Sequence, residues 1–219
     1  GKAISKLNIL KSVLKRLKVI FIKNNFDVTI VHCELLPFLP GWLERSLIPK
    51  PYIFDFDDAW HLRYKLNRSS FFRFFLENKI DKIVEGSSFV AAGNTYLKNY
   101  AITLNSNTAL FPTVLDTDRY LPSKNRSSSK FTIGWIGSPS TAIYLKELIA
   151  PLTTLGLEGS VLLKIVGGKA PDIPNIEVEE VPWSETTEIE SINSFDVGVM
   201  PLVDDEWSKG KCAFKLLQY

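Results

Sequence analysis

The 219-residue sequence predicts an α/β protein built from two open, parallel-sheet domains. Short apolar runs alternate with helix-like segments in two successive series, and the runs lack the strict apolar–polar alternation of a half-exposed sheet. A polar, serine-rich stretch, LPSKNRSSSK at 121–130, separates the two series. We therefore expect a first domain over residues 1–121, a linker over 122–130 and a second domain over 131–219.

The first series accounts for four expected strands and three expected helices. The strands are expected at 26–33, 50–56, 87–93 and 108–112. The helices are expected at 40–47, 70–84 and 94–101, with Asn94 as the N-cap of the last one. Because the strands are short apolar runs, we expect helices to cover both faces of the sheet.

The second series repeats this alternation. Its strands are expected at 130–137, 161–168, 176–181 and 196–202. Its helices are expected from Thr141 to Ala150 with Pro151 ending the helix, from a Ser184 cap to Asn193, and over 208–219. An open sheet usually has about five or six strands, and the chain ends inside the last expected helix. We therefore expect both domains to be truncated, and residues 1–219 to be inactive on their own.

Composition limits the possible classes of protein. An apolar share of 45% supports a real core, and a net charge of +2 gives no reason to expect nucleic-acid binding. Cys33 and Cys212 lie far apart in apolar surroundings, which indicates buried thiols in a reducing compartment rather than a disulfide. No apolar run is long enough to span a membrane and no signal-peptide pattern is present, so a cytoplasmic location is predicted.

The first 24 residues form a basic, helix-like segment. Seven lysine and arginine residues precede the first acidic residue, Asp27, and leucines recur at helical spacing, as at Leu7, Leu10 and Leu14. Such a helix over 2–24 fits peripheral contact with the anionic inner face of a membrane. The alternative is a surface helix whose apolar face packs on a sheet, and the pattern favours this second interpretation.

A glycine-containing turn, GWIGSPS at 134–140, joins an expected strand to an expected helix. Ligands of open α/β sheets bind beyond the carboxyl ends of strands, where helix N-termini offer N–H groups to anions. Gly134 and Gly137 would allow a phosphate to approach the backbone closely, and Ser138 would add a hydroxyl. A tight strand–helix turn without a ligand is an equally good interpretation.

The segment SKGKCAFKLLQY at 208–219 places lysines at the start of an expected helix. A cation in the first turn, such as Lys211, opposes the helix dipole unless an anion is bound there. A diphosphate would satisfy both the lysine and the helix end, with Lys215 one turn later and Gln218 offering its amide to sugar hydroxyls. The alternative is a solvated basic face.

Three aspartates stand at the end of the expected strand 50–56, in DFDDAWH at 55–61. The spacing would suit Mg²⁺ or Mn²⁺, and Asp57 and Asp58 would equally hold acceptor hydroxyls or act as a general base. A further alternative is that these aspartates cap the next segment. His61 is a candidate neighbour in this cluster, with a packed or surface histidine as the alternative. His32, inside the strand 26–33, is expected to be buried, with the alternative that its strand end and Glu34 line the cleft.

Taken in order, these segments resemble the bacterial family-four glycosyltransferases, which have the GT-B architecture. FPTVLDTDRYLP at 111–122 is similar to the family's Pro-x-x-x-Asp hinge, and FTIGWIGSPSTAIYLKEL at 131–148 looks like the start of its donor domain. DVGVMPLVDDEWSKGKCAFKLLQY at 196–219 resembles its donor-side segment, and YIFDFDDAWH at 52–61 fits one subgroup of its acceptor domain. The resemblance covers most of the chain and depends on the ordered set of segments.

The resemblance implies two Rossmann-like domains that face a cleft and transfer of a sugar with retention of configuration. The donor would be a UDP- or GDP-sugar, the acceptor a polysaccharide, glycan or lipid-linked sugar of the bacterial cell envelope, and no metal would be required. Gly134, Gly137, Ser138, Lys211, Lys215 and Gln218 would bind the donor; Gly167, Gly168 and Trp183 would lie near the nucleobase; Asp57 and Asp58 would be catalytic.

The chain departs from the family pattern at its acidic pair. Gly210 occupies the place of the first Glu of the Glu-x₇-Glu signature and Gln218 that of the second. Two alternatives therefore stay open: a transferase-like binding module without turnover, and a nucleotide-sugar epimerase on the same architecture.

Overall fold

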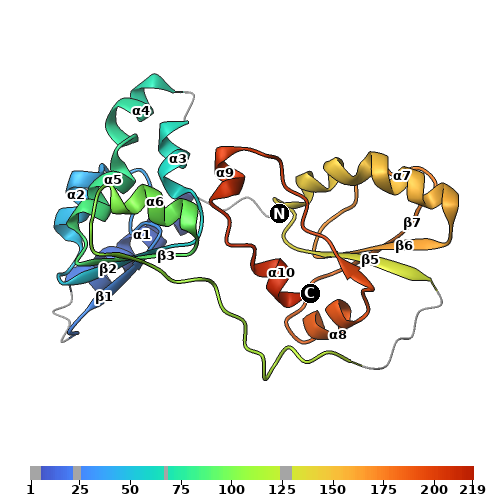
Figure 1. Cartoon of the computed structure of the whole chain (residues 1–219). Coiled ribbons are helices and arrows are strands. Elements are labelled where there is room, and N and C mark those ends of the chain that lie inside the picture. The colour runs from blue at the N-terminus through green and yellow to red at the C-terminus, as the bar shows by residue number, and fades with distance from the viewer. Residues whose placement is uncertain (1–5, 22–25, 67–68, 124–129) are drawn as a thin grey trace. The chain divides into compact units, whose positions relative to one another are not determined.

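The computed structural model describes residues 6–21, 26–66, 69–123 and 130–219 (Figure 1). The chain forms two compact units. The first unit comprises Gly1–Pro112 and Asp205–Cys212, and the second comprises Thr113–Asp204 and Ala213–Tyr219. The first unit thus includes a segment near the C-terminus that the sequence assigns to the second domain. Most of the expected linker 122–130 lies outside the described residues.

The first unit contains a four-stranded parallel sheet in the order β1-β2-β3-β4. Its strands are β1 (Thr29–His32), β2 (Tyr52–Phe56), β3 (Phe89–Ala92) and β4 (Thr108–Leu110). Its helices are α1 (Lys6–Phe21), α2 (Gly41–Leu47), α3 (Trp60–Lys65), α4 (Ser70–Leu76), α5 (Lys79–Gly86), α6 (Thr95–Ile102) and α9 (Glu206–Lys209). Asn94 caps α6 as predicted, because its side chain accepts a hydrogen bond from the Leu97 N–H at 2.8 Å.

The core of the first unit lies mainly on one face of its sheet. Phe54, Phe56 and Val90 are fully buried, and they share a cluster with Ile83 of α5 and Leu97 of α6. In β2 the buried residues alternate with half-buried ones, which is the pattern of a sheet with one deeply covered face. In the described part of this unit, one face of the sheet is therefore buried more deeply than the other.

A buried cation stabilises the first unit. The side chain of Lys79 is 0% exposed, and its Nζ lies 2.8 Å from Glu34 Oε2 and 2.9 Å from Glu44 Oε2. Nζ also donates to the Leu36 carbonyl at 2.5 Å. Burial raises the pKa of Glu44, while Lys79 acts in the opposite direction. The three side chains therefore form one hydrogen-bonded ionic group away from water.

The second unit contains a parallel sheet in the order β7-β6-β5-β8. Its strands are β5 (Phe131–Ile136), β6 (Val161–Val166), β7 (Glu177–Val181) and β8 (Val197–Gly198). Its helices are the 3₁₀-helix η1 (Ala142–Leu148) and the α-helices α7 (Ile149–Glu158), α8 (Glu188–Asn193) and α10 (Phe214–Gln218). The α/β class with two open parallel sheets, predicted from the sequence, is confirmed.

Both faces of the second sheet carry a buried cluster. Trp135 and Leu163 pack with Leu145 of η1 and Leu152 of α7. A second cluster joins strand residues to α8, through Ile136, Val166 and Ile192. Five of the six residues of β5 are buried, as expected for a central strand covered on both sides.

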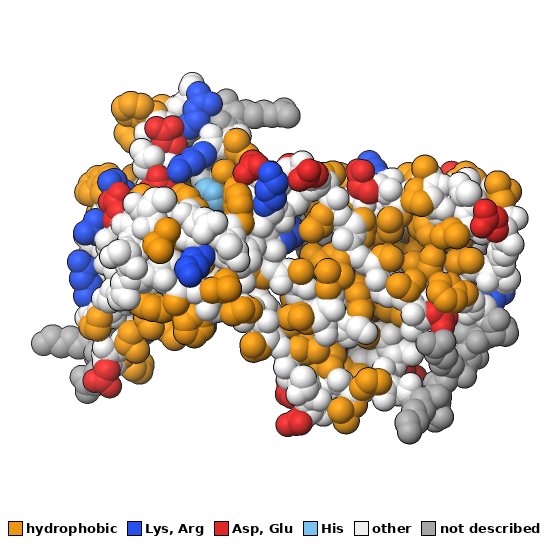
Figure 2. All heavy atoms as spheres, in the orientation of Figure 1, with side chains coloured by type: hydrophobic (Ala, Val, Ile, Leu, Met, Phe, Trp, Pro, Cys, Tyr) orange, Lys and Arg blue, Asp and Glu red, His pale blue; other side chains and the backbone are white. Residues whose placement is uncertain are grey.

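The expected helix over 70–84 is two helices, α4 and α5. Asn78, a poor helix former, stands between them as the N-cap residue of α5. The phenylalanines of α4 are largely exposed (Phe71 69%, Phe72 45%, Phe74 77% and Phe75 52%), whereas Ile80 and Ile83 of α5 are buried. Figure 2 shows hydrophobic and basic side chains together on α4. The aromatic face predicted for one long helix therefore lies outside the core.

Other helix boundaries also differ from the prediction. Pro151 does not end a helix but lies in the first turn of α7, where its missing N–H has no intrahelical partner to lose. Ser184 is not a helix cap, because α8 begins later, after Thr187. The expected helix over 208–219 is interrupted: Gly210 ends α9, and Ala213 adopts a left-handed conformation (φ 54°) before α10.

The basic N-terminal segment is helical over Lys6–Phe21, and the flanking residues of the expected 2–24 helix lie outside the described part. Arg16 donates to the Leu35 carbonyl at 2.6 Å, so α1 contacts the rest of the first unit, to which it belongs. Leu14 is 56% exposed, while Leu17 is half-buried. None of the helices that the structure describes combines the length and apolar character that a membrane crossing requires. Membrane contact through this helix stays a prediction.

Candidate functional site

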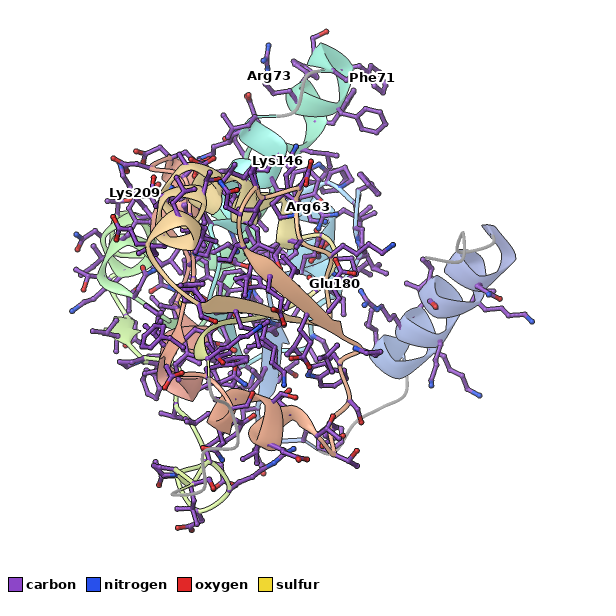
Figure 3. The ribbon with its side chains drawn as sticks, turned by 90° about the vertical axis from the view of Figure 1, so that its right-hand side faces the viewer. Arg63, Phe71, Arg73, Lys146, Glu180 and Lys209 are labelled. Carbon is purple, nitrogen blue, oxygen red and sulfur yellow. The ribbon has the colours of Figure 1, made fainter. Side chains whose placement is uncertain are left out.

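The second unit has a cavity of about 1110 Å³ at the carboxyl ends of β5, β6 and β7. Ser138 and Lys146 line it from the segment after β5, Lys169 from the segment after β6, and Glu180 and Trp183 from β7 and the loop that follows it. Figure 3 labels Lys146 on η1 and Glu180 on β7. This edge of a parallel sheet is where ligands of open α/β domains bind.

Three glycines line this cavity: Gly137, Gly167 and Gly168. On the side away from the cavity, each is tightly packed against other residues of the second unit. A Cβ on Gly167, whose φ is +81°, would lie 2.4 Å from the Gly137 carbonyl oxygen. A Cβ on Gly137 would lie 2.7 Å from the Trp135 ring, and one on Gly168 would lie at the same distance from that ring. Any side chain at these positions would therefore displace Trp135 or the adjoining turn. The glycines bring two backbone turns together at the cavity wall.

Trp183 is held in place by a buried carboxylate. Its Nε1 donates to Glu188 Oε2 at 2.5 Å, and the other carboxylate oxygen accepts from Gln218 Nε2 at 3.0 Å and from the Tyr120 hydroxyl. Glu188 is only 9% exposed, whereas Trp183 is 52% exposed and faces the cavity. The indole therefore presents a fixed ring to a ligand, since its one polar atom is already bonded.

Two lysines of the cavity wall, Lys146 and Lys169, are exposed and belong to segments that follow neighbouring strands. Ser138 adds a hydroxyl that lies 2.9 Å from the Ser140 hydroxyl. A flat aromatic ring, two cations and a hydroxyl at one cavity suit a ligand that combines a planar group with anionic oxygens.

Lys215 lies next to Gly137, at the turn that follows β5. Its Nζ is 4.6 Å from the centre of the Trp135 ring, and a Cβ on Gly137 would lie 2.6 Å from Nζ. Lys215 thus neighbours Gly137, although it is not among the residues that line the cavity. Gln218 is likewise outside the lining, because its amide is bonded to Glu188 and Tyr120.

Gly134 differs from the other predicted donor-site glycines. It lies within β5, is buried, and a Cβ there would lie 2.0 Å from the Phe195 ring. Gly134 is therefore explained by the Phe195 ring, which packs against β5 where a side chain would otherwise be.

Lys211 belongs to the first unit and is not in a helix. Its Nζ lies 3.0 Å from Asp58 Oδ1. The Asn94 amide donates to the carbonyls of Lys209 and Lys211, both at 3.1 Å, and so holds this segment beside the start of α6. The expectation that Lys211 starts a helix carrying Lys215 one turn later is therefore wrong, since Ala213 separates the two.

Asp58 is half-buried between this lysine and the rest of the acidic segment. Burial raises its pKa, the Lys211 ammonium acts in the opposite direction, and Asp57 adds a smaller upward effect. A carboxylate with a raised pKa is a better proton acceptor near neutral pH. The pair therefore provides a candidate base whose position is set by a lysine.

A second polar cluster lies at the carboxyl ends of β1 and β2. His32 Nδ1 lies 3.1 Å from Asp55 Oδ2, and His32 Nε2 lies 3.7 Å from Asp57 Oδ1. The side chain of His32 is 57% exposed, so the expectation of a buried histidine is wrong. The reason is that residues of β1 alternate between buried Val31 and exposed neighbours.

His61 does not join the acidic cluster. Its ring is buried and stacks on Tyr100, with ring centres 3.9 Å apart. Burial and then the Lys65 charge lower its pKa to about 4. His61 is therefore a neutral, packed residue.

Of the predicted donor residues, the structure brings Gly137, Ser138, Gly167, Gly168 and Trp183 to one cavity. Sequence reasoning missed Lys146, Lys169 and Glu188. Lys169 directly follows Gly168, which was a usable signal, but nothing local points to Glu188 as the partner of Trp183. Compared with known proteins, the chain matches no family model and no curated protein sequence.

Proposed function

We propose that the chain belongs to a retaining glycosyltransferase, which moves a sugar from a nucleotide-sugar donor to a polysaccharide, glycan or lipid-linked acceptor. The single observation that carries the proposal is the second-unit cavity, where a fixed tryptophan and two lysines meet at the carboxyl edge of a parallel sheet. The ordered resemblance of the sequence segments to family-four glycosyltransferases supports it independently.

In this proposal the second unit binds the donor nucleotide. The Trp183 ring stacks on the nucleobase, and a bonded Nε1 keeps that ring from rotating away. Lys146 and Lys169 neutralise the diphosphate, and the Ser138 hydroxyl donates to one of its oxygens. Each group acts on the part of the donor that its chemistry suits.

Catalysis then depends mainly on charge. The bond between the anomeric carbon and the diphosphate oxygen breaks, and the leaving nucleoside diphosphate takes up negative charge that lysines stabilise. The acceptor oxygen bonds to the same face of the anomeric carbon, and its proton passes to the departing phosphate. No second carboxylate nucleophile is needed, in contrast to retaining glycosidases. Asp57 and Asp58 of the first unit are proposed to bind acceptor hydroxyls.

A second candidate function is a binding module without turnover. It is favoured by Gln218, which stands in place of an acid and whose amide is bonded to Glu188 and Tyr120. Assays of sugar transfer and of donor hydrolysis by this protein distinguish the two. Product formation supports the transferase, and tight donor binding without product supports the module.

The nucleotide site is tested by titrating the 219-residue chain with UDP, GDP and their sugar conjugates. Replacing Trp183 with Ala is expected to weaken binding of the preferred nucleotide by about 5- to 150-fold, because stacking on a base contributes about 1–3 kcal/mol. The matched control is Trp42→Ala, since Trp42 is also exposed (67%) but lies in the first unit. Equal affinity of the Trp183→Ala variant and the unmodified chain would contradict the proposed site.

A further inference from the structure

The carboxyl edge of the first sheet carries a mixed set of metal-ligating side chains, of which the proposed function uses only Asp57. The ligand atoms of His32, Cys33 and Asp57 all lie within 4.8 Å of one another. Two of these residues are adjacent in sequence, and adjacent side chains of an extended strand point to opposite faces. Cys33 instead has a left-handed backbone (φ 63°), so the alternation of β1 ends where the cluster begins.

The distance between His32 and Asp57 is informative. Nε2 and Oδ1 are 3.7 Å apart, which is too long for a hydrogen bond of about 2.7–3.2 Å. Imidazole and carboxylate ligands of a tetrahedral Zn²⁺, with bonds of about 2.0–2.2 Å, place their donor atoms roughly 3.3–3.6 Å apart. The observed separation is close to this range, so a small movement of either exposed side chain would let the two groups share an ion.

Asp55 orients the imidazole toward such an ion. A carboxylate only accepts hydrogen bonds, so in the neutral histidine Nδ1 donates to Asp55 Oδ2, and Nε2 keeps its lone pair. His32 and Asp55 are register partners on the paired strands β1 and β2, which fixes this contact in the sheet. A carboxylate behind a ligating histidine is the usual support of a zinc ligand.

The charges around the cluster favour a cation. Among the described residues, Lys211 pairs with Asp58, and Arg63 and Lys79 pair with Glu34. The ion pairs found for Asp55 and Asp57 in the same part of the chain involve only His32. In these ion pairs, Asp55 and Asp57 therefore contact the His32 imidazole and no lysine or arginine.

We propose that His32 Nε2, Cys33 Sγ and one Asp57 carboxylate oxygen form a zinc-binding site, with Asp55 as the positioning residue. Imidazole and thiolate ligands select Zn²⁺ over Mg²⁺ and Ca²⁺, which prefer oxygen. The thiol gives its proton to solvent when the thiolate binds the ion. Three protein ligands leave the fourth position to water or to a ligand hydroxyl, and the exposed sides of His32 and Asp57 give the ion access.

The zinc site is tested by measuring metal content, which requires neither a nucleotide nor sugar transfer. A failure of the proposed function would therefore not decide the outcome of this test. The 219-residue chain, prepared without a histidine tag and stripped with a chelator, is dialysed against buffered free Zn²⁺ and its metal content is measured. One zinc ion per chain is expected. Co²⁺ in place of zinc is expected to give a thiolate-to-cobalt absorption band.

Variants identify the ligands. Cys33→Ser, His32→Gln and Asp57→Asn are each expected to weaken zinc binding by about 100-fold or more, and Asp55→Asn by about 10- to 100-fold. His32 and Asp57 are exposed, so their variants test the site even if Cys33→Ser, at a buried position, fails to fold. Cys212→Ser and His61→Phe, which change the other cysteine and the other histidine, are expected to bind zinc as the unmodified chain does.

Three results would overturn the proposal. The first is a folded chain that retains only trace zinc. The second is unchanged binding in both His32→Gln and Asp57→Asn. The third is loss of binding in Cys212→Ser. Either of the first two would leave His32 as a histidine between two aspartates, without a metal, and the third would assign the zinc to Cys212 instead.

Discussion

The two units have sheets of the same parallel type, but the carboxyl edges of these sheets have opposite chemistry. In the first unit the edge is occupied by His32, Cys33 and a run of aspartates, all of which suit a cation or hydroxyl groups. In the second unit it is occupied by glycine turns, Trp183 and two lysines, which suit a planar group with anionic oxygens. The architecture therefore sets where a ligand binds, and the residues after each strand set which ligand.

The two units also differ in how they are stabilised. The second sheet is buried on both faces by apolar clusters. The first sheet has its main core on one face, and part of its interior is the ionic group of Lys79, Glu34 and Glu44. The difference predicts that charge deletions will damage the first unit and that changes of side-chain volume will damage the second.

The largest effect is expected from Lys79→Met. Removing one member of a buried ionic group leaves Glu44 without a cation and Glu34 with Arg63 alone, which costs about 3–5 kcal/mol of unfolding free energy. Hydrogen exchange in increasing urea, resolved for peptides of each unit, is expected to show this loss in the first unit and not in the second.

Two further variants sharpen that test. Lys82→Met, which removes an exposed pair with Glu85, is expected to change the free energy by less than about 0.5 kcal/mol. Combining Lys79→Met with Glu44→Gln is expected to recover part of the loss, because one unpaired charge is gone. A stable Lys79→Met variant would show that the ionic group is dispensable.

The next effect concerns side-chain volume in the second unit. Gly134→Ala places a Cβ 2.0 Å from the Phe195 ring and is expected to destabilise the second unit by about 1–3 kcal/mol. Gly159→Ala is the matched control, since a Cβ there meets no atom within 4 Å. Equal unfolding free energies for the two variants, in the same exchange experiment, would remove the packing explanation of Gly134.

The smallest effect is the pH dependence due to His61. Its folded-state pKa is lowered to about 4, below the usual value of 6.5, so between these values the unfolded chain binds a proton that the folded chain does not. Stability is therefore lost as the pH falls through this window, by about 2 kcal/mol at pH 5 relative to pH 7.

His61→Phe keeps an aromatic ring against Tyr100 and removes the titration. Urea unfolding of this variant at pH 7 and pH 5 is expected to lack that part of the loss. A difference between the two pH values that is the same in the variant and in the unmodified chain would assign the acid sensitivity to other groups.

The sequence predicted the fold class, the paired strands and the cap at Asn94 because these depend on local patterns of apolar and capping residues. It did not predict the position of Lys211, which depends on hydrogen bonds from the distant Asn94. It also treated 70–84 as one helix, because apolar residues recur on both sides of the polar break at Asn78.

The candidate sites were predictable to different degrees. The glycines and Trp183 of the cavity follow strand ends and were found, whereas Glu188 reaches Trp183 only through the fold. The pairing of Lys79 with Glu34 and Glu44 joins residues 45 and 35 positions apart in the numbering, and no local signal marks it. The cluster at His32 was missed because an exposed histidine in an apolar strand segment looks buried by sequence.

We propose above that the second-unit cavity binds a nucleoside diphosphate. The most direct measurement is a titration of the ¹⁵N-labelled chain with UDP and with GDP, followed through backbone amide and indole signals. One of the two nucleotides is expected to shift the amide signals of Gly137, Gly167 and Gly168 and the indole signal of Trp183, while the indole signal of Trp42 stays unchanged. Saturating nucleotide that leaves the three glycine amides and the Trp183 indole unshifted would contradict it.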